Sequence, residues 1–168
     1  YIRDGSGDLD YTLRNEVGVM RQMLQEAGLE VVITTVSGQA LETDSVRINP
    51  DLRMEDVQLG DFSGMIIPCM HAGAIEPDPL AVRMVRSAVA DKRPVAVQHA
   101  AIIILAKAGL VQGRKYTFHE ELDTKQFPEF ETSTYCGTGI VREGEIIISG
   151  VCPYIGMLYD MDGDEGLN

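Results

Sequence analysis

Two polar residues, Gln98 and His99, interrupt an otherwise apolar passage near the middle of the chain. Before them, Pro94 and the apolar run that ends at Val97 are typical of a buried parallel strand. After them comes an alanine-, isoleucine- and leucine-rich segment that is long enough for a helix and stops at Gly109. A strand that turns sharply into a helix, with a polar side chain at the corner, is the layout of a nucleophile elbow. The sequence therefore predicts that Gln98 stands above the carboxyl edge of a sheet, beside backbone N–H groups that can stabilise an oxyanion.

The two corner residues differ in the chemistry they can perform. An amide such as Gln98 has no useful nucleophilicity and no pKa near neutrality, so it cannot replace a thiolate. It can donate and accept hydrogen bonds, which suits either a binding pocket with an inert corner or a degenerate site. The imidazole of His99 can act as a general base, although a histidine after a strand is more often a packed, hydrogen-bonded residue.

The passage from Lys92 to Thr117 resembles the signature of the ThiJ/PfpI superfamily, the DJ-type members of the class I glutamine amidotransferase-like fold. That signature runs G-K-P-[VI]-A-A-I-C-H-G-[PA] and continues L-A-x-A-G-L-L-x-G-[RK]-x-x-T. We place the family's nucleophilic cysteine at Gln98 and the histidine that follows it at His99. The resemblance extends from about Glu16 to Pro153. It implies a homodimer and an α/β fold, a flavodoxin-like three-layer α/β/α sandwich with a mainly parallel central sheet.

The resemblance brings three further residues to the corner. Glu16 lies twelve residues before Gly28, the offset at which the family keeps a protonated glutamate that hydrogen-bonds the cysteine. Burial there would raise its pKa. Cys69 and Cys152 fall at the carboxyl ends of central strands, where the family has glycine. Ligands in open α/β sheets bind at this edge, so these residues join Gln98 and His99 as candidates for the site.

Three roles for the two cysteines stay open. Cys69 or Cys152 could be a displaced nucleophile with His71 or His99 as its base. The same four residues could bind a metal of the softness of zinc. Most often, however, free cysteines are small buried apolar residues. Because no spacing rule links these residues, we predict no cofactor and no metal.

Two other potentially reactive residues are interpreted as inert. Cys136 lies in a loop or at the start of a strand. His119 is followed by two glutamates, and we interpret this stretch as exposed acidic surface, although the resemblance implies that its neighbourhood lines the mouth of the pocket or a subunit contact.

The remaining pattern alternates helices and strands, as in a parallel α/β sheet. Amphipathic periodicity predicts helices over 11–27 and 79–90, apolar runs predict strands over 29–36 and 62–68, and a Glu-Gly turn predicts a hairpin over 140–150. Residues 1–10 are predicted to form a loop in which only Tyr1-Ile2 could belong to a first strand. Residues 155–159 allow only one or two helical turns. We expect one domain over 1–168, with its first strand and last helix truncated.

Composition narrows the function classes. The 168 residues suffice for one domain, and 45% hydrophobic with 24% charged residues is an ordinary soluble composition. The net charge of −12 argues against nucleic acid or an anionic membrane surface as a partner. The sequence shows no signal peptide and no bilayer-spanning run. Three cysteines without framework spacing favour a reduced, cytoplasmic protein.

Three functions follow from these observations. The first is a ThiJ/PfpI homologue without the usual elbow cysteine that binds a small molecule or retains an altered catalytic activity. The second is a cysteine-dependent enzyme, intracellular protease-like or glyoxalase/deglycase-like, that uses Cys69 or Cys152 as a displaced thiol. The third is a chaperone-like interaction protein whose pocket is inert.

Overall fold

The computed structural model describes residues 1–4, 9–69 and 76–161. Its helical segments are α1 Leu9–Tyr11, η1 Thr12–Val17, α2 Gly18–Glu26, η2 Met54–Asp56, η3 Leu59–Asp61, α3 Pro79–Ala90, η4 His99–Ala101, α4 Ile102–Lys107, η5 Pro128–Phe130 and α5 Pro153–Leu158. Its strands are β1 Thr34–Thr35, β2 Leu41–Glu42, β3 Arg47–Ile48, β4 Leu52–Arg53, β5 Met65–Ile67, β6 Val95–Gln98, β7 Lys115–Tyr116, β8 Thr134–Tyr135, β9 Ile140–Glu143 and β10 Ile146–Ser149. No helix within these ranges has the length and apolar character needed to cross a bilayer.

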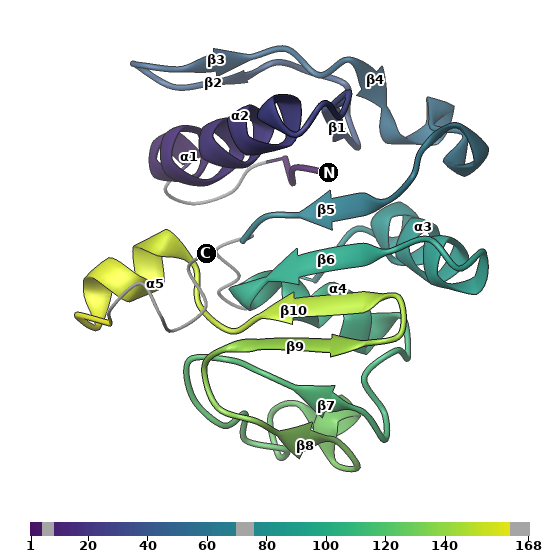
Figure 1. Cartoon of the computed structure of the whole chain (residues 1–168), viewed down its shortest axis with the longest axis vertical. Helices are drawn as coiled ribbons and strands as arrows, with labels where there is room; N and C mark the ends of the chain where they lie inside the picture. The colour runs from purple at the N-terminus through teal and green to yellow at the C-terminus, as the bar shows by residue number, and fades with distance from the viewer. Residues whose placement is uncertain (5–8, 70–75, 162–168) are drawn as a thin grey trace.

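The central sheet has the strand order β5-β6-β10-β9. Strands β5 and β10 both run parallel to β6, whereas β9 runs antiparallel to β10. The predicted hairpin is therefore confirmed, and Gly144 supplies its turn with a φ of 62°. Because parallel strands bring their carboxyl ends to one edge, β5, β6 and β10 all end on the same side of the molecule (Figure 1).

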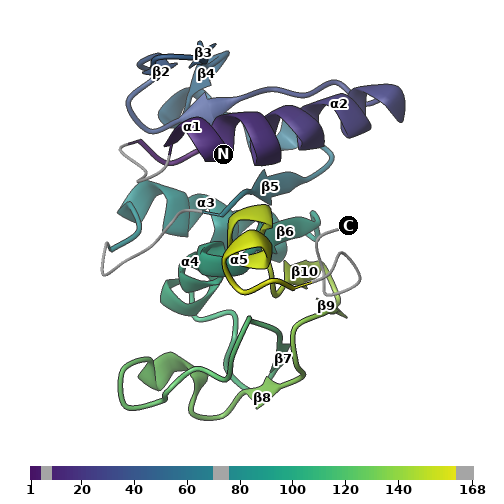
Figure 2. The ribbon, with the colours of Figure 1, turned by 90° about the vertical axis from the view of Figure 1, so that its left-hand side faces the viewer.

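Side chains of the sheet alternate between two layers of helices. Val95 and Val97 of β6 belong to the main hydrophobic core together with buried residues of α3 and α4. Ala96 of β6 and Ile147 of β10 point to the opposite side, where they line a cavity shared with α2. Figures 1 and 2 show α3 and α4 together against one face of the sheet, while the α1–α2 helix lies on the other side. This arrangement confirms the flavodoxin-like three-layer architecture.

Helix α3 has the start and the face that its sequence predicts. Asp78 caps its N-terminus by accepting a hydrogen bond of 2.7 Å from the Leu80 backbone N–H, and Pro79 occupies the first turn. The buried face consists of Ala81, Val85 and Ala88. The predicted helix over 79–90 is therefore confirmed to the residue.

The first two residues take the place of an interior strand. The backbone nitrogen of Tyr1 donates to the carbonyl of Ile66 at 2.7 Å, and that of Ile2 donates to the carbonyl of Thr34 at 3.0 Å. Tyr1-Ile2 therefore bridges β5 and β1 (Figure 1), although these two residues do not form a strand of their own.

Two local predictions are wrong. The loop expected to reach residue 10 ends earlier, because α1 already begins at Leu9. The strand expected over 29–36 is reduced to β1, which pairs with β4. Residues 29–32 border the cavity instead of a paired strand, and apolar character alone does not make a strand without a neighbour.

Candidate functional site

The predicted strand–turn–helix corner is present, but it lies one residue later than predicted. Strand β6 ends at Gln98, whose backbone is extended with φ −114° and ψ 126°. The turn is made by His99, which has a φ of 46°, and η4 and α4 follow directly. A left-handed backbone at a residue other than glycine costs on the order of 1–3 kcal/mol and is found preferentially at functional sites. The corner residue is therefore His99.

Gln98 is the last residue of a central strand. It is paired with Ser149 of β10, its side chain is buried, and its Oε1 atom meets no hydrogen-bond partner among the described residues. Placing the amide at the corner was thus wrong, and the reason is a register error of one residue. The family signature counts five residues from its proline to its cysteine, and the fifth residue after Pro94 is His99.

Two cysteines flank the corner residue. Cys69 follows β5, and its Sγ lies 3.5 Å from Nδ1 of His99. Cys152 follows β10 and is the N-cap residue of α5. The two sulfur atoms and a ring nitrogen of His99 all lie within 4.8 Å of one another, and all three residues are buried. The strand order explains this convergence, because β6 lies between β5 and β10 and its corner stands between the two cysteines.

His119 extends the site on the far side of His99. Its Nδ1 lies 2.7 Å from Nε2 of His99, and its Nε2 lies 3.5 Å from a carboxylate oxygen of Glu120. Phe118 stacks on the His99 ring with centroids 4.3 Å apart. Burial, and next the neighbouring His99, lower the pKa of His119 from its usual 6.5, so its ring is neutral at pH 7.

The interpretation of His119 as exposed acidic surface is therefore wrong, since only 15% of its side chain is exposed. Sequence reasoning missed this residue because its neighbours Glu120 and Glu121 suggested solvent. The available signal was its position two residues after Lys115-Tyr116-Thr117, a segment with the pattern of a short strand, because residues that follow a strand of the sheet often line a site.

Glu16 approaches the cysteines from the helix on the other layer. It belongs to η1, the π-helical part of the first helix, and is 1% exposed. π-Helical segments are frequent at functional sites. Burial, and then the sulfur of Cys69, raise the pKa of Glu16 to about 8. The Cys152 thiol and the Cys69 backbone oppose this shift, but neither carboxylate oxygen meets a donor in good hydrogen-bond geometry among the described residues. Glu16 is therefore mostly protonated at neutral pH.

The three thiols have different environments. A hydrogen bond with the Cys69 side chain is the largest cause that raises the pKa of Cys152, and burial adds to it. Cys152 therefore stays a thiol at neutral pH. Cys136 is exposed, and its Sγ lies 3.6 Å from the carbonyl oxygen of Thr134. His71, the other predicted base, lies outside the described residues.

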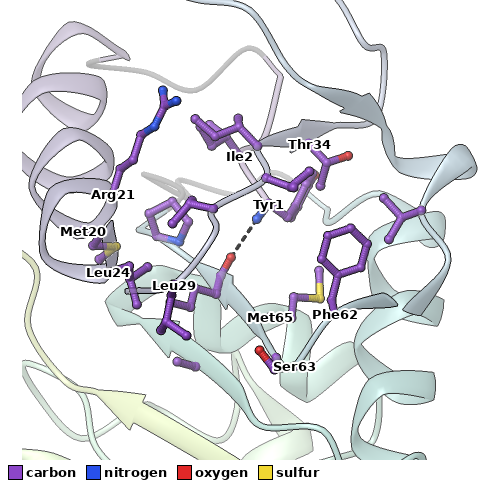
Figure 3. A pocket seen from close by; sticks show the side chains of 18 of the residues that line it. Tyr1, Ile2, Met20, Arg21, Leu24, Leu29, Thr34, Phe62, Ser63 and Met65 are labelled. Carbon is purple, nitrogen blue, oxygen red and sulfur yellow. Dashed lines mark hydrogen bonds between the residues drawn. The ribbon is translucent and has the colours of Figure 1, made fainter. Parts of the chain in front are cut away.

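A cavity of about 460 Å³ lies away from this cluster, between α2 and the sheet. One wall is formed by residues 29–34 and the other by residues 62–66, with Tyr1 and Ile2 between them (Figure 3). The lining is mainly apolar, with Arg21 at its border, and it includes none of Cys69, His99 and Cys152. The protein therefore has two separate candidate sites, a polar cluster at the sheet edge and an apolar cavity beneath α2.

Comparison with known proteins places this geometry in a family. DJ-1beta from Drosophila melanogaster is 22% identical and superposes with a TM-score of 0.64 over 88% of this chain and 77% of its own. A DJ-1 superfamily protein from Agrobacterium tumefaciens is 18% identical, with a TM-score of 0.69 over 98% of this chain and 89% of its own. A ThiJ/PfpI domain protein from Brachyspira murdochii is 14% identical, with a TM-score of 0.67 over 89% of this chain and 82% of its own.

At these identities the likeness to solved structures shows the fold alone. No curated protein matches the sequence. The family model described as DJ-1/PfpI family matches residues 9–155, which is most of the chain. The predicted family is therefore confirmed, and this chain belongs to the DJ-1/PfpI family.

Proposed function

We propose that this chain is a catalytically altered DJ-1/PfpI homologue in which a displaced thiol, Cys69, is the nucleophile. Its substrate would be a small carbonyl compound, attacked as in glyoxalase/deglycase-like or hydrolase-like chemistry. The observation that carries the proposal is the 3.5 Å contact between Cys69 Sγ and Nδ1 of the corner residue His99. A nucleophile and a base within hydrogen-bond reach, with the base held by a third group, form the general arrangement of covalent catalysis.

The hydrogen-bond chain supports one assignment of protons. A neutral His99 that accepts the thiol proton at Nδ1 carries its own proton at Nε2, from which it donates to Nδ1 of His119. His119 then carries its proton at Nε2, which faces the Glu120 carboxylate. His119 and Glu120 are thus positioning residues that hold His99 with its basic nitrogen toward Cys69.

The proposed reaction step follows from this assignment. His99 takes the proton of the Cys69 thiol, and the thiolate forms a carbon–sulfur bond with the carbonyl carbon. The carbonyl π electrons move to oxygen, which receives the proton from His99 to give a thiohemiacetal. The protonated Glu16, close to both sulfur atoms, is a second proton donor at the site. Because Cys69 is only 3% exposed, only small substrates would reach it.

The test is an activity assay with matched cysteine variants. Methylglyoxal, a small 2-oxoaldehyde, and p-nitrophenyl acetate, an activated ester, serve as probes of the two reaction types. We expect turnover of at least one probe, loss of that turnover in Cys69→Ala, and no change in Cys136→Ala, whose thiol is exposed and is not among the clustered donor groups. Turnover that survives Cys69→Ala, or its absence for both probes, would contradict the proposal.

The apolar cavity supports a second candidate function, the binding of a small apolar molecule. Its volume of about 460 Å³ lies within the range of ligand pockets, and its walls are mainly apolar. An environment-sensitive dye such as anilinonaphthalene sulfonate should bind with a stoichiometry of one. Val32→Trp, which fills part of the cavity, should weaken that binding about tenfold, whereas Val19→Trp on the exposed helix surface should not. Equal binding by both variants would exclude the cavity as the site.

A further inference from the structure

Three soft donor atoms converge at the corner in a way that the proposed thiol chemistry does not require. Catalysis by Cys69 needs only His99, yet the sulfur of Cys152 lies within 4.8 Å of both. We propose that Cys69, His99 and Cys152 form a zinc site, with two thiolates and one imidazole as ligands and a fourth position open toward Glu16. This inference shares two residues with the proposed function but does not rest on it.

The sheet geometry favours a metal over a disulfide between the two cysteines. Cys69 and Cys152 leave strands β5 and β10, which are separated by β6. Strands two positions apart in a sheet are about 9.6 Å apart. A disulfide needs Cα atoms about 4.4–6.8 Å apart, which is less than the spacing of the two strands that these cysteines follow. A metal ion joins side chains from three adjacent strands, because the central ligand comes from the strand between them.

The kind and number of ligands favour zinc. Two cysteines and one histidine are a known ligand set of zinc sites that keep one position open for water or substrate. Two thiolates neutralise the divalent charge, so the loaded site would be electrically neutral in surroundings that are buried and partly apolar, with Ala100 and Ile155 packed against the cysteines. The donor atoms all lie within 4.8 Å of one another, and Cys69 Sγ is 3.5 Å from Nδ1 of His99, so small side-chain rotations suffice to bring them to the bond lengths of a zinc site.

A second observation points to a ligand at the same place. The Glu16 carboxyl group is 1% exposed and meets no donor in good hydrogen-bond geometry among the described residues. It lies close enough to Cys69 and Cys152 to interact with both. A carboxylate or a water molecule held by it would complete four-coordinate geometry and give this buried carboxyl group a partner in good geometry.

The test measures metal binding directly. Protein freed of metal with a chelator, and kept reduced, is titrated with Zn²⁺ in competition with a chromophoric chelator. We expect one Zn²⁺ per chain, an affinity at least tenfold lower in Cys152→Ser, and an unchanged affinity in Cys136→Ser. Co²⁺ added to the same protein should give thiolate-to-cobalt charge-transfer absorption and the visible bands of tetrahedral coordination. Circular dichroism of each variant shows whether it is folded.

The outcomes separate this inference from the proposed function. Absence of stoichiometric Zn²⁺ binding by folded wild-type protein would overturn the zinc site, as would equal losses in the Cys152 and Cys136 variants. Methylglyoxal or ester turnover by the metal-free protein depends on Cys69 and His99 without a metal, and it is measured in a separate assay. Turnover without zinc binding would therefore overturn only the metal site.

Discussion

Replacing His99 with asparagine should lower the rate constant for alkylation of Cys69 by iodoacetamide at pH 7 by about 100-fold, the usual contribution of a positioned base. The imidazole Nδ1 that lies 3.5 Å from Cys69 Sγ would no longer accept the thiol proton. Asparagine tolerates the left-handed backbone of this corner, so the variant tests the base rather than the turn. The rate is measured by mass spectrometry of the Cys69 peptide in metal-free protein.

Two comparisons make this result specific. His119→Gln removes the ring that holds His99 but keeps the base, so it should slow alkylation less than His99→Asn does. The pH profile should also change, since His99→Asn removes the base and leaves the thiol to titrate alone at higher pH. An unchanged rate in folded His99→Asn would show that His99 does not activate Cys69.

The pH dependence of stability should reveal the buried Glu16. Its pKa is raised from 4.5 to about 8 in the folded protein, so the folded state binds more protons than the unfolded state between these values. The contribution of Glu16 to the free energy of unfolding should therefore fall by up to about 5 kcal/mol as pH rises from about 4.5 to about 8. The buried N-terminal amine of Tyr1, whose pKa is lowered to about 5, acts in the opposite direction over a similar range, so the effect of Glu16 is the difference between the wild type and Glu16→Gln. Glu16→Gln, which is neutral at every pH, should remove most of this fall and leave the protein more stable than the wild type at pH 8.

Denaturant unfolding of metal-free protein between pH 4 and pH 9 measures this effect. Glu30→Gln is the matched control, because Glu30 is exposed and its removal should leave the pH profile unchanged. If the profiles of the wild type and Glu16→Gln run parallel, the Glu16 carboxyl is not held in its neutral form by the fold.

Much of the architecture could be predicted because short segments of the sequence determine several of its helices and strands. The helix over 79–90 carries its cap, its N1 proline and its apolar spacing within one segment. The hairpin of β9 and β10 carries its glycine turn between two β-rich runs. In both cases the residues that determine the element lie within it or directly beside it in the sequence.

The details of the site could not be predicted in the same way. A one-residue shift of the corner from Gln98 to His99 changes no local pattern, because both residues are polar and lie between the same strand and helix. The contact between His99 and His119 joins residues twenty apart, and it depends on how the chain packs after β7. The length of β1 likewise depends on which strand lies beside it. The homodimer and the cytoplasmic location stay predictions.

The most direct measurement of the central claim is the relative alkylation rate of the three cysteines in native, metal-free protein, each normalised to its rate in denaturant. We predict that Cys69 reacts at least tenfold faster than Cys152 and Cys136, because its Sγ lies 3.5 Å from Nδ1 of His99. If burial alone determined the alkylation rates, Cys136 would react fastest, since Cys69 and Cys152 are buried and Cys136 is exposed. Fastest labelling of Cys136 would therefore contradict a thiol–imidazole site at this corner.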